Sequence, residues 1–136
     1  MAENQVTSGS RPCACESGSI PSEKEMNRAL ADRCGDRLAG AFSRAVVAIC
    51  GLGGLGSNIA VSLVRAGVGT LILIDFDKVD MTNLNRQQYK ADQIGMDKTE
   101  ALSANLREIN PYVSLTAHDL RLTAENAALL LEQADI

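Results

Sequence analysis

The chain has 136 residues, of which 46% are hydrophobic and 3% aromatic, and its formal net charge is −4. This length and composition predict one folded globular domain with a mostly aliphatic core. The acidic balance offers no broad basic surface, which argues against nucleic acid or an anionic membrane as a partner. Neither a signal-peptide pattern nor an 18-residue apolar run occurs, so we expect a cytoplasmic protein with no membrane partner.

The N-terminal residues differ in composition from the rest. Residues 1–21 are rich in Ser, Gly, Glu and Pro and show no periodicity, which predicts a disordered tail. A capping box at Ser22 and Glu25 predicts the start of a helix, and Gly35 its end. A second short helix is expected over residues 37–43. The folded domain is therefore expected to span residues 22–136.

The body of the chain alternates between two kinds of pattern. Strands are expected at 45–50, 70–75 and 112–117, and helices at 57–66, at 98–109 and after Thr123. Residues 134–136 have the pattern of the start of another strand. Parallel strands need crossover helices between them, so this order predicts an α/β fold: a Rossmann-like, doubly wound, mostly parallel sheet with a short N-terminal helical segment. The first two strands should be parallel neighbours.

The four cysteines give a weak signal. Cys13 and Cys15 form C-x-C in the expected tail, and no second pair follows at zinc-ligand spacing. Cys50 ends an expected core strand and is predicted to be a small buried hydrophobe. Reduced thiols are the favoured interpretation, also for Cys34, with a disulfide or metal site as the alternative; we assign no metal ligand.

A glycine-rich turn joins the first strand to the first core helix. It reads GLGGLG over residues 51–56, and the next strand ends at Asp75. Gly51 permits the tight turn, Gly53 lets backbone amides approach a phosphate, and Gly56 lets the helix pack against the strand. The helix N-terminus favours an anion, and Asp75 is placed to bind ribose hydroxyls. The pattern predicts nucleotide binding without naming the nucleotide.

The polar loop at residues 76–97 is long for a compact domain, and such loops are usually functional. Amide and cationic side chains gather there and just after it, at Asn83, Arg86, Gln87 and Lys98. An arginine and a lysine suit a triphosphate, whereas a dinucleotide enzyme needs no such cluster. The alternative is that Arg86 and Lys98 are ordinary surface charges. Asp77 and Asp80 are expected to be solvated loop carboxylates.

Together these motifs resemble the ThiF/MoeB/HesA family of ubiquitin-activating-like adenylyltransferases, over about residues 22–136. The matching segments are GLGGLG at 51–56, DFD at 75–77, NLNRQ at 83–87, Lys98 and INP at 109–111. The RQQY sequence at 86–89, with the short N-terminal helix, is most similar to the ThiF branch linked to thiamine sulfur transfer.

The resemblance implies an enzyme that uses ATP and Mg2+ to adenylate the C-terminal glycine of a small ubiquitin-like sulfur carrier protein. Gly54 and its neighbours would line the nucleotide, and Asn83, Arg86 and Gln87 would hold phosphates. Lys98 would stabilise charge on the α-phosphate, so Arg86 and Lys98 are the expected catalytic residues.

The family also implies a homodimer, in which Arg28 or Arg33 would reach the partner's site. Members of the family continue, beyond the position of residues 134–136, with a Mg2+-binding Asp and a carrier-binding half, so the chain is expected to be a fragment. Two other functions stay open. The glycine turn and Asp75 also suit a NAD-dependent oxidoreductase, and an isolated fragment suits a non-catalytic nucleotide-binding module. Titration with ATP and with NAD distinguishes them.

Overall fold

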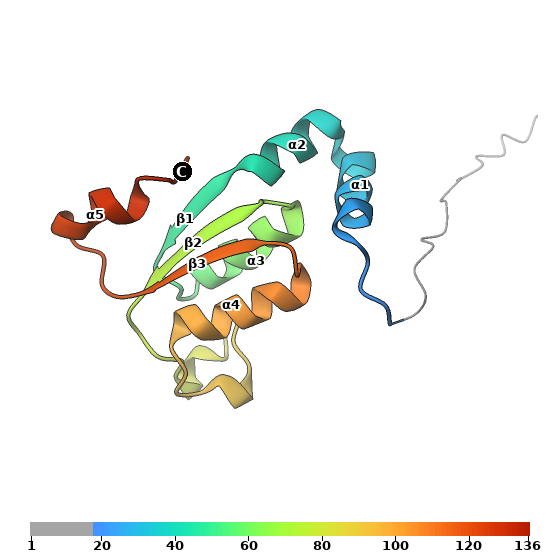
Figure 1. Cartoon of the computed structure of the whole chain (residues 1–136). Coiled ribbons are helices and arrows are strands. Elements are labelled where there is room, and N and C mark those ends of the chain that lie inside the picture. The colour runs from blue at the N-terminus through green and yellow to red at the C-terminus, as the bar shows by residue number, and fades with distance from the viewer. Residues whose placement is uncertain (1–17) are drawn as a thin grey trace, which may run out of the picture.

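The computed structural model describes residues 18–136, and its elements follow the predicted order (Figure 1). They are α1 (Glu23–Cys34), α2 (Asp36–Arg44), β1 (Val46–Cys50), α3 (Gly56–Ala66), β2 (Thr70–Asp75), the 3-10 turns η1 (Met81–Asn83) and η2 (Ala91–Gln93), α4 (Lys98–Ile109), β3 (Ser114–Asp119) and α5 (Ala124–Leu131). Most of the expected tail, with Cys13 and Cys15, lies outside the described residues. Within residues 18–136, no helix has the length and apolar character needed to cross a bilayer.

The sheet has the order β1-β2-β3, and both pairings are parallel. The prediction that the first two strands are parallel neighbours is confirmed, with Val46 opposite Thr70. Residues 135 and 136 lie along the other edge of β1: Asp135 N donates to Val46 O and Ala48 N donates to Ile136 O, each at 2.8 Å. From the first hydrogen bond to the second, the residue number increases in both segments, so they run parallel.

The two N-terminal helices pack on each other near the amino ends of the strands (Figure 1). The predicted capping box is present, since Glu25 N donates to Ser22 Oγ and Ser22 N donates to Glu25 Oε2. Neither helix contains a buried residue. The chain is already attached to the domain before α1, because the Tyr112 hydroxyl donates to Pro21 O at 2.9 Å.

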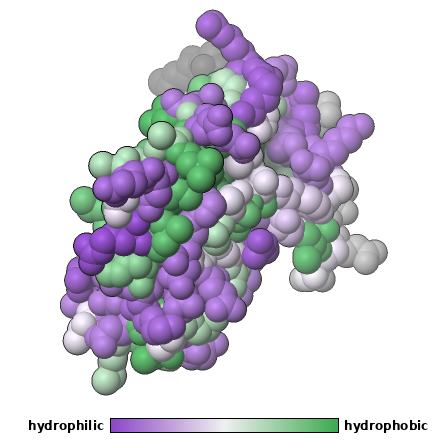
Figure 2. All heavy atoms as spheres, turned by 60° about the vertical axis from the view of Figure 1, so that its left-hand side comes forward, coloured by the Kyte–Doolittle hydropathy of each residue, from purple (hydrophilic) through white to green (hydrophobic). Residues whose placement is uncertain are grey.

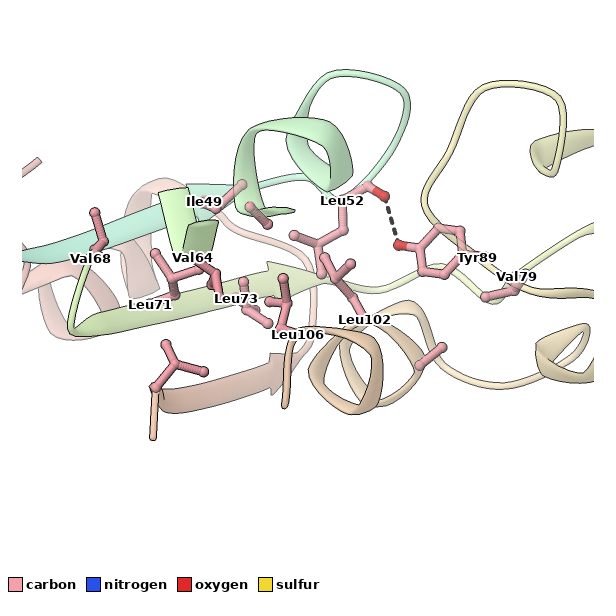
Figure 3. Packing of buried hydrophobic residues seen from close by; sticks show 13 residues of the cluster. Ile49, Leu52, Val64, Val68, Leu71, Leu73, Val79, Tyr89, Leu102 and Leu106 are labelled. Carbon is pink, nitrogen blue, oxygen red and sulfur yellow. Dashed lines mark hydrogen bonds between the residues drawn. The ribbon is translucent and has the colours of Figure 1, made fainter. Parts of the chain in front are cut away.

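The core lies between the sheet and the helices α3 and α4. Figure 2 looks toward the side that carries α5 and the carboxyl ends of the strands, where a largely hydrophilic surface is interrupted by hydrophobic residues. Inside, Leu71 and Leu73 lie on the face of β2 that packs against α3 and α4, and both are fully buried (Figure 3). Ile72 and Ile74 point to the opposite face and are also buried. The expected aliphatic core is confirmed, with Tyr89 as its aromatic member.

Candidate nucleotide site

A cleft of about 510 Å3 opens at the carboxyl ends of the strands, where α/β sheets bind their ligands. Its walls come from the end of β1 and the glycine turn, the end of β2, the start of α4, and the segment after β3. The residues that line it are Cys50, Gly51, Gly53, Ile74, Asp75, Phe76, Asp77, Lys98, Leu120, Arg121 and Leu122. Four of the residues predicted from sequence therefore meet here: Gly51, Gly53, Asp75 and Lys98.

Asp75 holds the glycine turn in place. Its side chain is only 7% exposed, and Oδ2 accepts a 2.6 Å hydrogen bond from Leu52 N. Its other oxygen, Oδ1, accepts from Asp77 N at 2.8 Å. A carboxylate has about four acceptor positions, so the two remaining positions suit the ribose hydroxyls predicted from sequence.

Tyr89 holds the same turn from the other side. Its hydroxyl donates to Leu52 O at 2.7 Å, so Leu52 is fixed at both its N–H and its carbonyl (Figure 3). Burial raises the pKa of Tyr89, with further increases from the charges of Asp75 and Asp77, so the phenol stays a protonated donor. Sequence reasoning assigned Tyr89 no role. The available signal was an aromatic residue in a polar loop of a chain with few aromatics.

The turn itself depends on two glycines. Gly51 has φ +94°, which side-chain-bearing residues rarely adopt. A Cβ on Gly56 would lie 1.8 Å from Gly51 O, so α3 could not approach the turn with any larger residue there. The first residues of α3 also tie down carbonyls of the turn: Ser57 Oγ donates to Gly53 O and Asn58 Nδ2 to Gly54 O, each at 2.6 Å. The second amide of the helix is used within the turn, because Ser57 N donates to Gly53 O at 3.0 Å. An anion at this end of α3 would meet the remaining first-turn amides.

Arg86 lies against the turn but outside the lining of the cleft. A Cβ on Gly54 would meet Arg86 Nε at 3.5 Å, so the arginine side chain packs over this glycine. Its Nη1 donates to Asn85 Oδ1 at 3.0 Å and to Thr82 O at 3.3 Å, and the side chain is exposed. The guanidinium is near the amino end of α3 and keeps further N–H donors.

The other two expected phosphate-binding residues have different surroundings. Gln87 is buried, its Nε2 lies 3.9 Å from the Cβ position of Gly53, and its Oε1 has no hydrogen-bond partner in the described part of the chain. Asn83 caps η1, where its Oδ1 accepts from Asp80 N at 3.0 Å. Gln87 is thus beside the turn, whereas the Asn83 side chain takes part in capping η1.

Lys98 is the first residue of α4 and is only 6% exposed. Its Nζ lies 3.1 Å from Asp77 Oδ2, and both residues line the cleft. The interpretation of Lys98 as an ordinary surface charge is wrong, because its side chain is buried at the cleft.

The prediction that Cys50 is buried is wrong: its side chain is exposed. Cys50 is the last residue of β1 and lines the cleft, and strand alternation turns it to the face opposite the buried Ile49. Cys34 is also exposed, and both are free. Residues 18–136 contain no group of three or more His, Cys, Asp or Glu side chains that could hold a metal ion.

The two arginines expected to act toward a partner lie on α1, near the amino ends of the strands and away from the cleft (Figure 1). Arg28 forms ion pairs with Asp32 at 2.8 Å and with Asp36 at 3.9 Å, and Arg33 is exposed. A role for either in a partner's site stays a prediction.

The ThiF family model matches residues 26–136. The chain belongs to the ThiF family. Over 77 residues it is 46% identical to ubiquitin-like modifier-activating enzyme 5 of Oryza sativa subsp. japonica and 47% identical to the protein of that name in Arabidopsis thaliana. Each match covers 57% of this chain and 18% of the relative, so this ThiF-family chain spans only a small part of the curated relatives' length.

Solved structures of this family share the fold. The E. coli tRNA N6-threonylcarbamoyladenosine dehydratase TcdA in complex with ATP superposes with a TM-score of 0.77 at 33% identity, covering 85% of this chain and 49% of that chain. Its AMP complex gives 0.76 at 33% identity, with coverages of 84% and 48%. E. coli MccB with ATP gives 0.61 at 33% identity, with coverages of 70% and 28%.

Proposed function

We propose that this chain provides the ATP site of an enzyme that adenylates the C-terminal glycine carboxylate of a small ubiquitin-like protein. The observation that carries the proposal is the cleft in which the glycine turn, Asp75 and the buried cation Lys98 meet. Membership of the ThiF family and the ATP and AMP complexes of its solved relatives support an adenine nucleotide in that cleft.

In the proposed reaction, a carboxylate oxygen of the substrate forms a bond to the α-phosphorus of ATP, and the bond from that phosphorus to the pyrophosphate oxygen breaks. Negative charge grows on the α-phosphate and on pyrophosphate. Fixed donors that face this charge stabilise the transition state more than the ground state. In this proposal, Lys98 stabilises the charge on the α-phosphate. The free amides at the start of α3, with Arg86 and Gln87 beside the turn, bind the other phosphates.

Mg2+ accompanies ATP in this proposal. Because no cluster of carboxylates suited to a metal occurs in residues 18–136, we assign the ion no ligand here and no step in the reaction.

The protein substrate is proposed at two levels. The relatives named ubiquitin-like modifier-activating enzyme 5, and the structure of MccB with MccA-N7isoASN, support a small protein or peptide substrate. The narrower proposal, a sulfur carrier of thiamine biosynthesis, rests on the RQQY sequence at 86–89 and the short N-terminal helix. A cytoplasmic homodimer is part of the same narrower proposal.

Calorimetric titration of the 136-residue chain with ATP and with NAD tests the nucleotide. We expect ATP binding that weakens in Arg86→Ala and little affinity for NAD. Equal affinity for NAD, with no effect of Arg86→Ala, would favour the oxidoreductase and overturn the proposal.

Carrier-dependent ATP–pyrophosphate exchange, in a longer protein that contains this chain, tests the chemistry. Lys98→Ala should lower the maximal rate roughly 100-fold, the order seen when one preorganised donor is lost, with a smaller change in ATP affinity. Lys90→Ala is the matched control, since Lys90 lies in the polar loop before α4, outside the lining of the cleft, and pairs with the exposed Glu108. Exchange by Lys98→Ala at the unmutated rate contradicts the catalytic role of Lys98, whereas a complete lack of exchange in the unmutated protein favours a non-catalytic module. Parallel assays with a sulfur carrier and with a protein modifier decide the substrate.

A further inference from the structure

Lys98 is a buried cation with one acidic partner at close range. Its side chain is 7% exposed, whereas that of Asp77, whose Oδ2 lies 3.1 Å from Nζ, is 50% exposed. A buried ammonium is costly unless a counter-charge accompanies it. Asp77 supplies that charge from the solvent side of the cleft: it is an exposed loop carboxylate, as predicted from sequence, and also the partner of Lys98.

The backbone sets these two residues opposite each other. Lys98 N donates to Asp77 O at 3.0 Å, and Lys78 and Asp97 form an antiparallel bridge next to them. Val79 N donates to Met96 O at 2.9 Å, which extends the ladder. The two ends of the polar loop are therefore joined by a short antiparallel ladder, which fixes Asp77 relative to the start of α4.

A second acid–lysine pair in the same ladder provides an internal comparison. Lys78 Nζ pairs with Asp97 Oδ1, with side chains that are 65% and 32% exposed. Neither residue lines the cleft. The two pairs have the same chemistry and the same backbone support, and they differ in burial and in access to the cleft.

The donors of Lys98 also suit a ligand. An ammonium group carries three N–H donors, and within the described residues the Nζ of Lys98 makes one hydrogen bond, to Asp77. Two donors are therefore left at a group that lines the cleft. Asp77 therefore restricts the Lys98 side chain but accepts only one of its hydrogen bonds.

We propose that Asp77 is the positioning residue for Lys98: its carboxylate holds the buried ammonium at the cleft with two donors directed to an incoming phosphate. The catalytic meaning of this arrangement rests on the function proposed above. The contact between the two side chains does not depend on that function, so the contact and its catalytic meaning can be tested separately.

Acylation of lysines in the 136-residue chain by acetic anhydride, followed by peptide mass spectrometry, tests the contact. In Asp77→Asn, Lys98 should be acylated at least about tenfold faster than in the unmutated chain, because the ammonium loses the charge that keeps it in the buried position. In Asp97→Asn, the matched control, the rate at Lys98 should be unchanged while the rate at Lys78 rises. An unchanged rate at Lys98 in Asp77→Asn overturns the proposal, whether or not the chain binds ATP.

Pyrophosphate exchange in the longer protein tests the catalytic meaning. Asp77→Asn should lower kcat by about 10- to 100-fold, the cost of a misplaced catalytic group, with a smaller change in KM for ATP. Asp77→Glu, which keeps the carboxylate, should recover part of the rate and keep Lys98 slow to acylate, and Asp97→Asn should react at the unmutated rate. If only KM changes, or if Asp77→Asn and Asp97→Asn lower kcat equally, the ladder has a structural role only and Asp77 does not position Lys98. Faster acylation together with no exchange activity in the unmutated protein would retain the contact and refute the proposed function.

Discussion

At the scale of single residues, the nucleotide cleft depends on how Leu52 is held. Asp75 accepts from its N–H and Tyr89 donates to its carbonyl, so removing the hydroxyl leaves a buried acceptor without its donor. We expect Tyr89→Phe to lower the free energy of unfolding by about 1–3 kcal/mol, the usual cost of an unsatisfied buried group, and to weaken ATP binding. Urea unfolding and calorimetry measure the two effects. Unchanged values would show that Leu52 is fixed without Tyr89.

The raised pKa of Tyr89 also predicts a pH dependence. The folded state keeps the phenolic proton above the ordinary tyrosine pKa of about 10, whereas the unfolded chain releases it. The unfolded state then binds fewer protons, so this contribution to stability is complete below about pH 10 and is lost as pH rises further. Urea unfolding of the unmutated chain should show a steeper loss above that pH than Tyr89→Phe does. Parallel curves for the two proteins contradict the assignment.

Sequence reasoning found residues whose role follows from the backbone and missed those whose role follows from tertiary contact. The need for a glycine at position 51 and the position of Lys98 at the start of α4 could be predicted from motif spacing. The bond from Tyr89 to Leu52 joins residues 37 positions apart, and no local pattern encodes it. Cys50 was wrongly predicted to be buried because it follows the buried Ile49 and, by strand alternation, faces the opposite side of β1.

At the scale of elements, α3 and the glycine turn before it are packed closely as one unit, and substitution of Gly56 tests this packing. Because its Cβ would lie 1.8 Å from Gly51 O, Gly56→Ala must move the helix or the turn and should cost about 1–3 kcal/mol or more. Gly53→Ala is the matched control: its nearest neighbour, Gln87 Nε2, is 3.9 Å away, and stability should change by no more than about 0.5 kcal/mol. Thermal unfolding measures both. Equal stability of the two variants would mean that the turn adapts.

The elements themselves were the most predictable part of the molecule. The Ser22 capping box and the glycine after each of α1 and α3 marked helix ends correctly, since these signals act through the adjacent backbone. The third strand was expected at 112–117 and lies at Ser114–Asp119, because its alternation is weak and its pairing with β2 sets the register. The ladder that joins the ends of the polar loop was not predicted, since it depends on residues about twenty positions apart.

At the scale of the whole molecule, the alternation of strand and helix was enough to predict a parallel sheet, because parallel neighbours need crossover connections and these are almost always right-handed. The same alternation explains why the cleft lies where it does. Each strand ends on the same side of the sheet, so the glycine turn after β1, Asp75 at the end of β2 and the segment after β3 converge without any contact being specified in the sequence.

The outer edge of β1 predicts that copies of this chain associate in solution. A groove of about 630 Å3 runs along this edge, lined in part by Leu55, Ile59 and Ile136, which are 82%, 48% and 86% exposed. Asp135 and Ile136 hydrogen-bond this edge at Val46 and Ala48, and a strand edge that is covered over part of its length beside apolar surface invites association. We therefore expect the 136-residue chain to associate as its concentration rises, as measured by sedimentation velocity.

Leu55→Glu should shift this association to higher concentration, because the charge would have to be buried between copies. Leu129→Glu is the matched control: Leu129 is 76% exposed on α5 but does not line the groove, so its substitution should leave the sedimentation profile unchanged. A chain that stays monomeric at all concentrations, or equal effects of the two substitutions, would mean that the groove along β1 is not the associating surface. An effect confined to Leu55→Glu assigns the association to the groove along β1 rather than to the general hydrophobicity of the surface.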